Sequence, residues 1–221
     1  MQRHRQGKAK RVPRRRRHSP ALYEKKYNGR GYKLIAGVDE VGVGPWAGPV
    51  VAAAVILRDF RFKVRIYDSK ALSPRCRQSA FSEIKDKAYT ALGIVDADTI
   101  DKINIYNATR LAMERAISAL RPRPDYVLVD GRQRPAICVP SESIVRGDRK
   151  SISIAAASII AKVVRDRIMQ DYDKVYPGYE FARHKGYGTE KHRLALERLG
   201  PCLIHRRSFK PLKIGGLLLK Q

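Results

Sequence analysis

Cysteine is scarce in this chain, and its pattern excludes two classes of small protein. Only Cys76, Cys138 and Cys202 occur in 221 residues, far apart and with no C-x-x-C pair. A disulfide framework or a cysteine-rich zinc site needs more cysteines at closer spacing. The sparse thiols suit a reducing compartment, so we expect a cytoplasmic protein.

Long apolar runs are also missing. No stretch approaches the ~18 apolar residues of a membrane-spanning helix, and the GGLLL near the C-terminus is far shorter. The basic opening MQRHRQGKAKRVPRRRRH is not followed by the apolar segment of a secretory signal. Its arginine-rich composition is compatible with a transit peptide, but serine is scarce, which favours a solvated tail. We expect no membrane partner.

Acidic residues are outnumbered by basic ones. The chain has 46 Lys and Arg against 21 Asp and Glu, a formal net charge of +25, which is typical of a nucleic-acid-binding protein. Residues 1–30 hold 12 basic residues and one acid, Glu24, so they contribute +11 and the remainder +14. We therefore expect a disordered basic tail over 1–30, which adds affinity for phosphate, and one domain over 31–221.

The apolar pattern predicts an α/β domain with a mixed sheet, because two strands come first and strands then alternate with helices. The first two strands are joined by a glycine-rich connection that fits an antiparallel hairpin. The predicted strands are 32–39, 49–57, 91–97, 126–130 and one within 137–145. The predicted helices are 74–89, 98–120 in two pieces, 151–172 and 189–200.

Three aspartates fall at the ends of predicted elements. Asp39 closes the first strand, Asp130 closes the fourth, and Asp148 precedes the long helix. If the first and fourth strands are neighbours, Asp39 and Asp130 lie side by side at one edge of the sheet. Glu40 can join them only if its strand has already ended, because adjacent strand residues point to opposite faces.

Carboxylates gathered in this way would repel one another, and a divalent metal ion would relieve the repulsion. All-oxygen ligands favour Mg²⁺ or Mn²⁺, and two such ions ~3.5–4 Å apart commonly hydrolyse a phosphodiester. The alternative is that each aspartate is only a turn residue or a helix cap. Spacing alone leaves both interpretations open.

The glycine-rich turn GVGPWAG contains Gly42, Gly44 and Gly48. It does not match the dinucleotide-binding fingerprint, and a strand rather than a helix follows it, so no helix N-terminus is available for a pyrophosphate. Glycine also allows the backbone to approach a ligand closely, such as a sugar hydroxyl. A tight turn without further function is the alternative.

Two further segments suit nucleic-acid contact. Lys70 lies in the polar stretch DSKALSP, where it could bind a phosphate or simply be solvated. Tyr187 lies among glycines and basic residues in RHKGYGT, where it could stack on a sugar or base or cover the core. The histidines His184, His192 and His205 lack zinc-site spacing, and the chain has no G-x-S-x-G motif to supply a nucleophilic serine. The sequence therefore supports neither a zinc site nor a Ser-His triad.

Taken together, these segments resemble the type 2 ribonucleases H, and specifically bacterial ribonuclease HII. The resemblance runs in the family's order over about residues 35–209 and rests on GVDEVGVGPWAGPVVAAAV, DSKALSP, VLVDG, GDRKSISIAAASIIAKVVRDR, HKGYGTEKH and HRRSF. It implies a ribonuclease H-like fold: a mixed five-stranded sheet flanked by helices, with a C-terminal helical region. Residues 31–221 would then be the catalytic domain of a monomer.

The resemblance also implies an activity. This is cleavage of the RNA strand of RNA–DNA hybrids, and of ribonucleotides embedded in duplex DNA as in ribonucleotide excision repair, by a two-metal mechanism with Mg²⁺ or Mn²⁺ that leaves 5′-phosphate and 3′-hydroxyl ends. The family's metal-binding and catalytic acids correspond to Asp39, Glu40, Asp130 and Asp148. Its substrate-binding residues correspond to Gly42, Val43, Gly44, Lys70 and Tyr187.

One position departs from the family pattern. The turn usually has arginine between its first two glycines, and here Val43 stands there. Ribonuclease HIII also lacks that arginine, so hybrid cleavage with poor activity on single ribonucleotides is an alternative. The PWAGP that follows resembles HII, and ~30 basic residues are too few for the folded N-terminal domain of HIII.

A non-catalytic nucleic-acid-binding protein is the rival from another class, because charge alone would suffice for it. Four acids beside a phosphate-binding surface would be unfavourable in such a protein unless they held metal.

Overall fold

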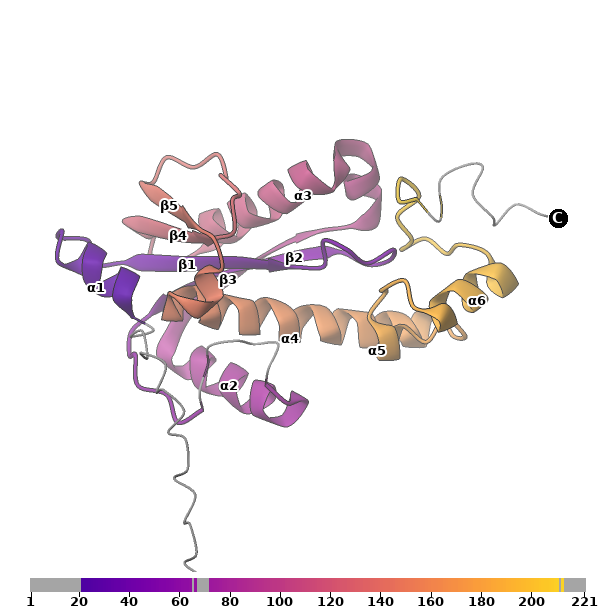
Figure 1. Cartoon of the computed structure of the whole chain (residues 1–221), viewed down its shortest axis with the longest axis horizontal. Coiled ribbons are helices and arrows are strands. Elements are labelled where there is room, and N and C mark those ends of the chain that lie inside the picture. The colour runs from indigo at the N-terminus through magenta and orange to yellow at the C-terminus, as the bar shows by residue number, and fades with distance from the viewer. Residues whose placement is uncertain (1–20, 65, 67–71, 211, 213–221) are drawn as a thin grey trace, which may run out of the picture.

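The computed structural model describes residues 21–64, 66, 72–210 and 212. Its centre is a five-stranded sheet in the order β3-β2-β1-β4-β5 (Figure 1). The strands are β1 Ile35–Val41, β2 Val50–Leu57, β3 Ala88–Val95, β4 Tyr126–Asp130 and β5 Ser141–Ile144. The helices are α1 Leu22–Asn28, α2 Pro74–Lys87, α3 Ala97–Ala119, α4 Ile152–Val175, α5 Phe181–His184 and α6 Glu190–Leu199, with the 3₁₀ turn η1 Gly147–Arg149.

The strand pairing confirms the predicted mixed sheet. β1 pairs antiparallel with β2 and parallel with β4, and β4 pairs parallel with β5. The predicted hairpin and the adjacency of the first and fourth strands are therefore both confirmed. In the β1–β4 ladder Val38 lies opposite Val129, so the next residues along, Asp39 and Asp130, are brought to the same edge.

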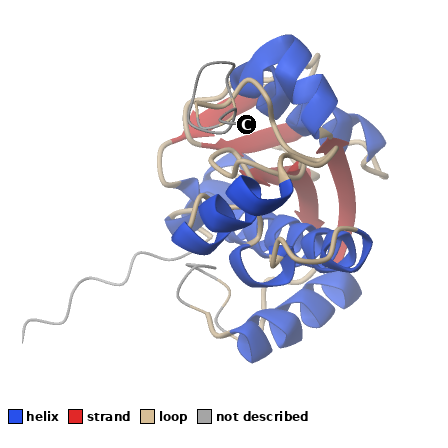
Figure 2. Ribbon diagram, turned by 90° about the vertical axis from the view of Figure 1, so that its right-hand side faces the viewer, coloured by secondary structure: helices blue, strands red, loops and turns tan. Residues whose placement is uncertain are grey.

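Helices cover both faces of the sheet (Figure 2). α3 packs on one face, and α2 and α4 pack on the other. The alanine-rich start of α4 lies almost against β1, because a Cβ added to Gly37 would fall 2.1 Å from the carbonyl carbon of Ser153. This close packing fixes α4, and the turn before it, relative to the ends of β1 and β4.

The helix ends follow the sequence signals. Ser73, Asp96, Ser151 and Thr189 are N-caps whose side chains accept a backbone N–H bond from the first turn of their helices. The predicted break in the 98–120 helix is confirmed at Asn104, whose φ is 65°. Among the described residues no helix is both long and apolar enough to cross a membrane.

The N-terminal segment and the first strand differ from the expectation. Residues 22–28 form α1 instead of continuing a disordered tail to residue 30, because Glu24 and Tyr27 are buried against the domain. The strand that was expected to end at Asp39 continues through Glu40 to Val41, since both residues pair with β2. The expectation of disorder for residues 1–20 lies outside the described residues.

Candidate active site

Three structural elements deliver the acidic residues. Asp39 comes from β1, Asp130 from the end of β4, and Asp148 from η1 immediately before α4. The Asp130 carboxylate accepts a hydrogen bond from the Gly147 amide at 2.6 Å, which ties the end of β4 to the turn that carries Asp148. The sheet register and this hydrogen bond therefore explain the assembly of all three.

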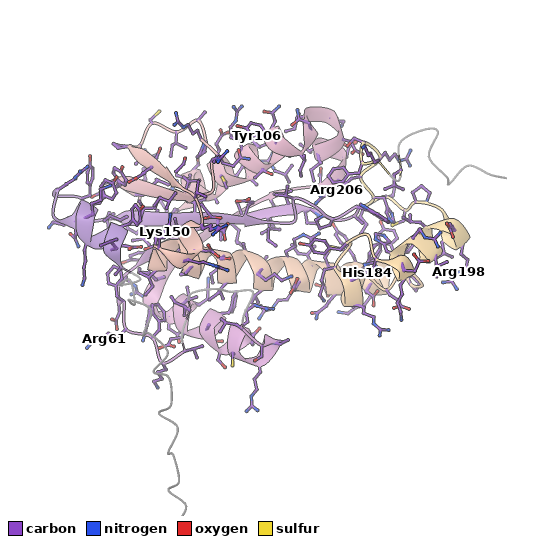
Figure 3. The ribbon with its side chains drawn as sticks, in the orientation of Figure 1. Arg61, Tyr106, Lys150, His184, Arg198 and Arg206 are labelled. Carbon is purple, nitrogen blue, oxygen red and sulfur yellow. The ribbon has the colours of Figure 1, made fainter. Side chains whose placement is uncertain are left out.

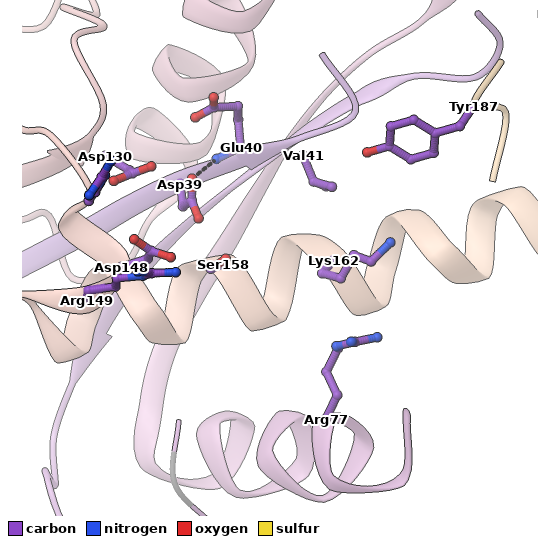
Figure 4. A pocket seen from close by; sticks show the side chains of 11 residues that line it. Asp39, Glu40, Val41, Arg77, Asp130, Asp148, Arg149, Ser158, Lys162 and Tyr187 are labelled. Carbon is purple, nitrogen blue, oxygen red and sulfur yellow. Dashed lines mark hydrogen bonds between the residues drawn. The ribbon is translucent and has the colours of Figure 1, made fainter. Parts of the chain in front are cut away.

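Glu40 reaches the same site by a different route from the one the sequence suggested. The strand has not ended, and the Asp39 and Glu40 side chains lie on opposite faces of β1 (Figure 4). β4 stops pairing with β1 at Val38, so beyond that point β1 has a strand neighbour on its β2 side only. Both faces of β1 are therefore open to the space beside it, and Asp39 and Glu40 line one cleft.

This cleft has a volume of about 660 Å³ and combines both signs of charge. The acids gather at one end and Tyr187 lies at the other, with Lys162 of α4 and Arg77 of α2 along the side (Figure 4). The lining residues are Asp39, Glu40, Val41, Arg77, Asp130, Arg146, Asp148, Arg149, Ser158, Lys162 and Tyr187. Acids at one end of a cleft that also carries basic residues suit a polyanion that is held by the basic residues and attacked at a metal site.

Burial and mutual repulsion disfavour the charged forms of two of these acids. Burial first, and then the charges of Glu40 and Asp130, raise the pKa of Asp39 well above its usual range, while a hydrogen bond from Ser158 opposes the shift. Burial also raises the pKa of Asp130, with the charge of Asp148 adding to it and the Gly147 amide opposing it. The cluster is thus unfavourable without a compensating cation.

The donor set fits a hard divalent ion, because all four side chains offer carboxylate oxygens. Asp39 and Asp130 carry raised pKa values that a bound cation would reverse. Within the described ranges, no three acidic, histidine or cysteine side chains already converge on one ion position. Ion binding therefore requires the carboxylates to turn toward a shared point.

Comparison with known proteins identifies the family of this chain. The profile of the family described as Ribonuclease HII matches residues 36–212. A ribonuclease HII of Listeria monocytogenes is 56% identical over 193 residues, covering 86% of this chain and 73% of that protein. The ribonuclease HII of Acetivibrio thermocellus is 55% identical over 189 residues, covering 85% and 74%. The chain belongs to the ribonuclease HII family.

A solved structure supports the same fold. The chain superposes on the PCNA:RNase HII complex from Archaeoglobus fulgidus with a TM-score of 0.70 and 25% identity, covering 85% of this chain and 98% of that one. The ribonuclease H-like fold and the family inferred from the sequence motifs are both confirmed.

The glycine-rich turn of this family member lies next to Tyr187. A Cβ on Gly44 would come 4.0 Å from the Tyr187 ring, so turn and ring face the same space. Gly42 has φ +95°, and a Cβ there would fall 2.3 Å from Nε of Arg165, so only glycine fits. Val43 is 40% exposed at the tip. Lys70 lies outside the described residues.

Tyr187 is supported from behind by buried histidines. The Nδ1 of His192 bonds the Tyr187 carbonyl at 3.0 Å, and the Nε2 of His192 lies 3.0 Å from the Nε2 of His205. The Tyr187 side chain itself is 42% exposed toward the cleft. His192 and His205 thus have a packing role behind Tyr187.

Sequence reasoning missed several cleft residues. Ser158 interrupts the apolar run of α4 on the face that meets Asp39, and a lone polar residue in such a run is a signal that could have identified it. The basic residues of the cleft could not be identified from the sequence, because the chain has many other lysines and arginines. The basic residues of the cleft are Arg77, Arg146, Arg149 and Lys162.

Proposed function

We propose that this chain is a metal-dependent endoribonuclease that cleaves the RNA strand of RNA–DNA hybrids, with Asp39, Glu40, Asp130 and Asp148 as the metal-binding acids. Membership of the ribonuclease HII family makes it a hydrolytic endoribonuclease. The observation that supports the metal assignment is the meeting of these four carboxylates in one cleft that also carries basic residues and Tyr187.

The four acids would hold Mg²⁺ or Mn²⁺. When bound, two such ions supply an activated water for in-line attack and charge stabilisation for the departing 3′ oxygen. Asp39 and Asp130 would hold this centre on the rigid sheet, and Asp148 would bring the third element to it. Ser158 holds the Asp39 carboxylate in place from α4.

The rest of the cleft would bind and orient the substrate. Arg146, Arg149 and, farther along the cleft, Lys162 carry positive charge that would attract the phosphates of the duplex. Tyr187 would stack on the sugar at the cleavage site. The backbone of the turn at Gly42 and Gly44 would recognise the 2′-hydroxyl, the group that distinguishes RNA from DNA.

Val43 bears on which ribonucleotide substrates are cleaved well. An arginine at this exposed position would add a charge-assisted contact to the duplex. Its absence should matter most at a single ribonucleotide embedded in DNA, where few other RNA-specific contacts exist. We therefore expect continuous hybrids to be cleaved faster than ribonucleotide-containing duplex DNA. We further propose that the protein acts in the cytoplasm as a monomer.

A divalent-ion titration tests this function against mere binding. Labelled RNA–DNA hybrid, all-DNA duplex and all-RNA duplex are incubated with the protein at rising Mg²⁺ or Mn²⁺. We expect ion-dependent cleavage of the RNA strand of the hybrid, with 5′-phosphate and 3′-hydroxyl ends, and none of the all-DNA duplex. Binding without cleavage at any ion concentration would instead identify a non-catalytic nucleic-acid-binding protein.

A further inference from the structure

Two fully buried arginines lie behind the glycine-rich turn. Arg165 belongs to α4. Arg206 lies in the segment after α6, beside the turn that joins β1 to β2 (Figure 3). Both are 0% exposed. Neither forms an ion pair with any carboxylate in the part of the chain that the structure describes, although the charges of Asp166 and Asp101 favour Arg165 and Arg206 from farther away.

Within the described residues, the guanidinium of Arg206 donates hydrogen bonds to main-chain carbonyls of the turn alone, and it also lies 5.1 Å from the centroid of the Phe209 ring. Its Nη2 donates to the carbonyls of Gly42 at 2.6 Å and Gly48 at 2.8 Å. Its Nη1 donates to Val43 at 3.1 Å and Pro45 at 2.8 Å, and its Nε donates to Gly48 at 3.0 Å. One guanidinium therefore holds four carbonyls from residues 42–48 around a single centre.

Arg165 connects the far end of the turn to the segment that carries Tyr187. Its Nε donates to the carbonyl of Pro49 at 2.9 Å and its Nη2 to that of Ala47 at 3.1 Å. Its Nη1 donates to the carbonyl of Lys185 at 2.9 Å, two residues before Tyr187. The two arginines thus fix the turn and the tyrosine segment relative to each other.

The direction of these carbonyls determines where the amides point. In a trans peptide unit the C=O and the N–H that share it point in opposite directions. The carbonyls of Gly42 and Val43 face the buried Arg206, so the N–H groups of Val43 and Gly44 face away from it. Both residues are exposed, and no described group accepts a hydrogen bond from either amide.

Stability alone does not account for this arrangement. Burial lowers the pKa of Arg206 to about 9 and of Arg165 to about 10, and the charge of Arg165 adds to the shift of Arg206. Apolar side chains of similar size often stabilise a protein more than buried charges do. A guanidinium, however, offers five donors in a rigid plane, which suits it to organise a turn that has no regular hydrogen bonds of its own.

We propose that Arg206 is a positioning residue for RNA recognition, which orders the turn of residues 42–48 so that the Val43 and Gly44 amides are presented to the ribose at the cleavage site. Arg165 supports it by holding the same turn against the Tyr187 segment. The inference rests on the proposed function, since it concerns how that site recognises its substrate.

Three variants test the role. Arg206→Met fills the space but removes every donor, Arg206→Ala leaves a cavity, and Ile84→Ala opens a fully buried cavity in the core beneath α2, without contact to the turn. Melting temperature, kcat and KM are measured on a continuous RNA–DNA hybrid. We expect kcat/KM to fall about tenfold or more for both Arg206 variants, and to stay near wild type for Ile84→Ala at a comparable loss of melting temperature.

Two readouts separate positioning from general stability. Millimolar guanidinium chloride should restore cleavage in Arg206→Ala but not in Arg206→Met, and it should leave the cleavage rate of Ile84→Ala unchanged. A 2′-fluoro substitution at a defined cleavage site should slow the wild type more than it slows Arg206→Met, because the two changes remove the same contact.

The outcomes also separate this inference from the proposed function. A wild type that cleaves no hybrid contradicts both. A wild type that cleaves, together with Arg206→Met of near-normal kcat/KM, overturns the positioning role alone. The same holds if the 2′-fluoro effect is equal in the two proteins, or if guanidinium restores the melting temperature of Arg206→Ala without its cleavage.

Discussion

The buried Glu24 of α1 gives the sharpest prediction about stability. It is 2% exposed, and its carboxylate accepts hydrogen bonds from the Ser151 hydroxyl at 2.5 Å and the Ser153 amide at 3.0 Å. Ser151 is the N-cap of α4, so a negative charge lies at the N-terminus of the longest helix, where the helix dipole favours it. α1 is thereby joined to the element that follows the Asp148 turn.

The expected effect of Glu24→Ala follows from these contacts. It leaves two buried donors without their acceptor, at about 1–3 kcal/mol for each. We therefore expect the free energy of unfolding to fall by about 2–6 kcal/mol. Glu24→Gln keeps an acceptor oxygen and loses only the charge, so it should lower the free energy of unfolding by about 1 kcal/mol.

Urea unfolding measures both variants through the midpoint and slope of the transition. Glu197→Ala serves as the control, because it removes a surface acid of α6 whose one ion-pair partner among the described residues is Arg193, and it should change stability by less than about 0.5 kcal/mol. If Glu24→Ala unfolds at the same urea concentration as Glu197→Ala, the assignment of α1 to the folded domain is wrong.

Three further results are expected. Deleting residues 1–20, which carry nine basic residues and no acid, should weaken hybrid binding and flatten its salt dependence while leaving kcat unchanged; a large fall in kcat would contradict this. Val43→Arg should lower the ratio of kcat/KM on continuous hybrids to kcat/KM on single-ribonucleotide duplexes. If the wild type already prefers the single-ribonucleotide duplex and the variant has the same ratio, the role given to Val43 is refuted. Burial lowers the pKa of His192 and His205 to about 4, below the unfolded value of about 6.5, so the unfolded state binds more protons between these values and stability should fall as pH drops from 6.5 to 4. At pH 5 this loss is about 2 kcal/mol per histidine relative to pH 7, and His205→Gln should show a smaller change with pH in urea unfolding.

The sequence was informative where local chemistry decides the structure. An aspartate at the end of an apolar run predicted the ends of β1 and β4 near Asp39 and Asp130, and their adjacency followed from one assumption about strand order that the register confirms. Serine or threonine is the N-cap of α2, α4 and α6, because a side-chain oxygen there satisfies a free amide.

Long-range contacts explain what the sequence did not reveal. Strand alternation predicted that Glu40 could join Asp39 only if the strand had ended. The strand continues, but β4 ends early and leaves both faces of β1 open to the cleft. α1 has a charged sequence that looks solvated, and only its contact with Ser151 shows why Glu24 is buried. Arg206 resembles any surface arginine in a basic chain, since buried arginines are rare and its partners lie about 160 residues earlier.

The central claim is that the carboxylates in the cleft hold the catalytic metal, and Asp130→Asn tests it most directly. This change keeps the shape of the side chain and removes its charge, and Asp171→Asn on the exposed surface of α4 is the matched control. Cleavage of a labelled RNA–DNA hybrid is followed at saturating Mg²⁺ or Mn²⁺, with circular dichroism to confirm that each variant is folded. We predict that Asp130→Asn loses activity by about two orders of magnitude or more while Asp171→Asn cleaves as the wild type does. Near-normal cleavage by folded Asp130→Asn would contradict the account.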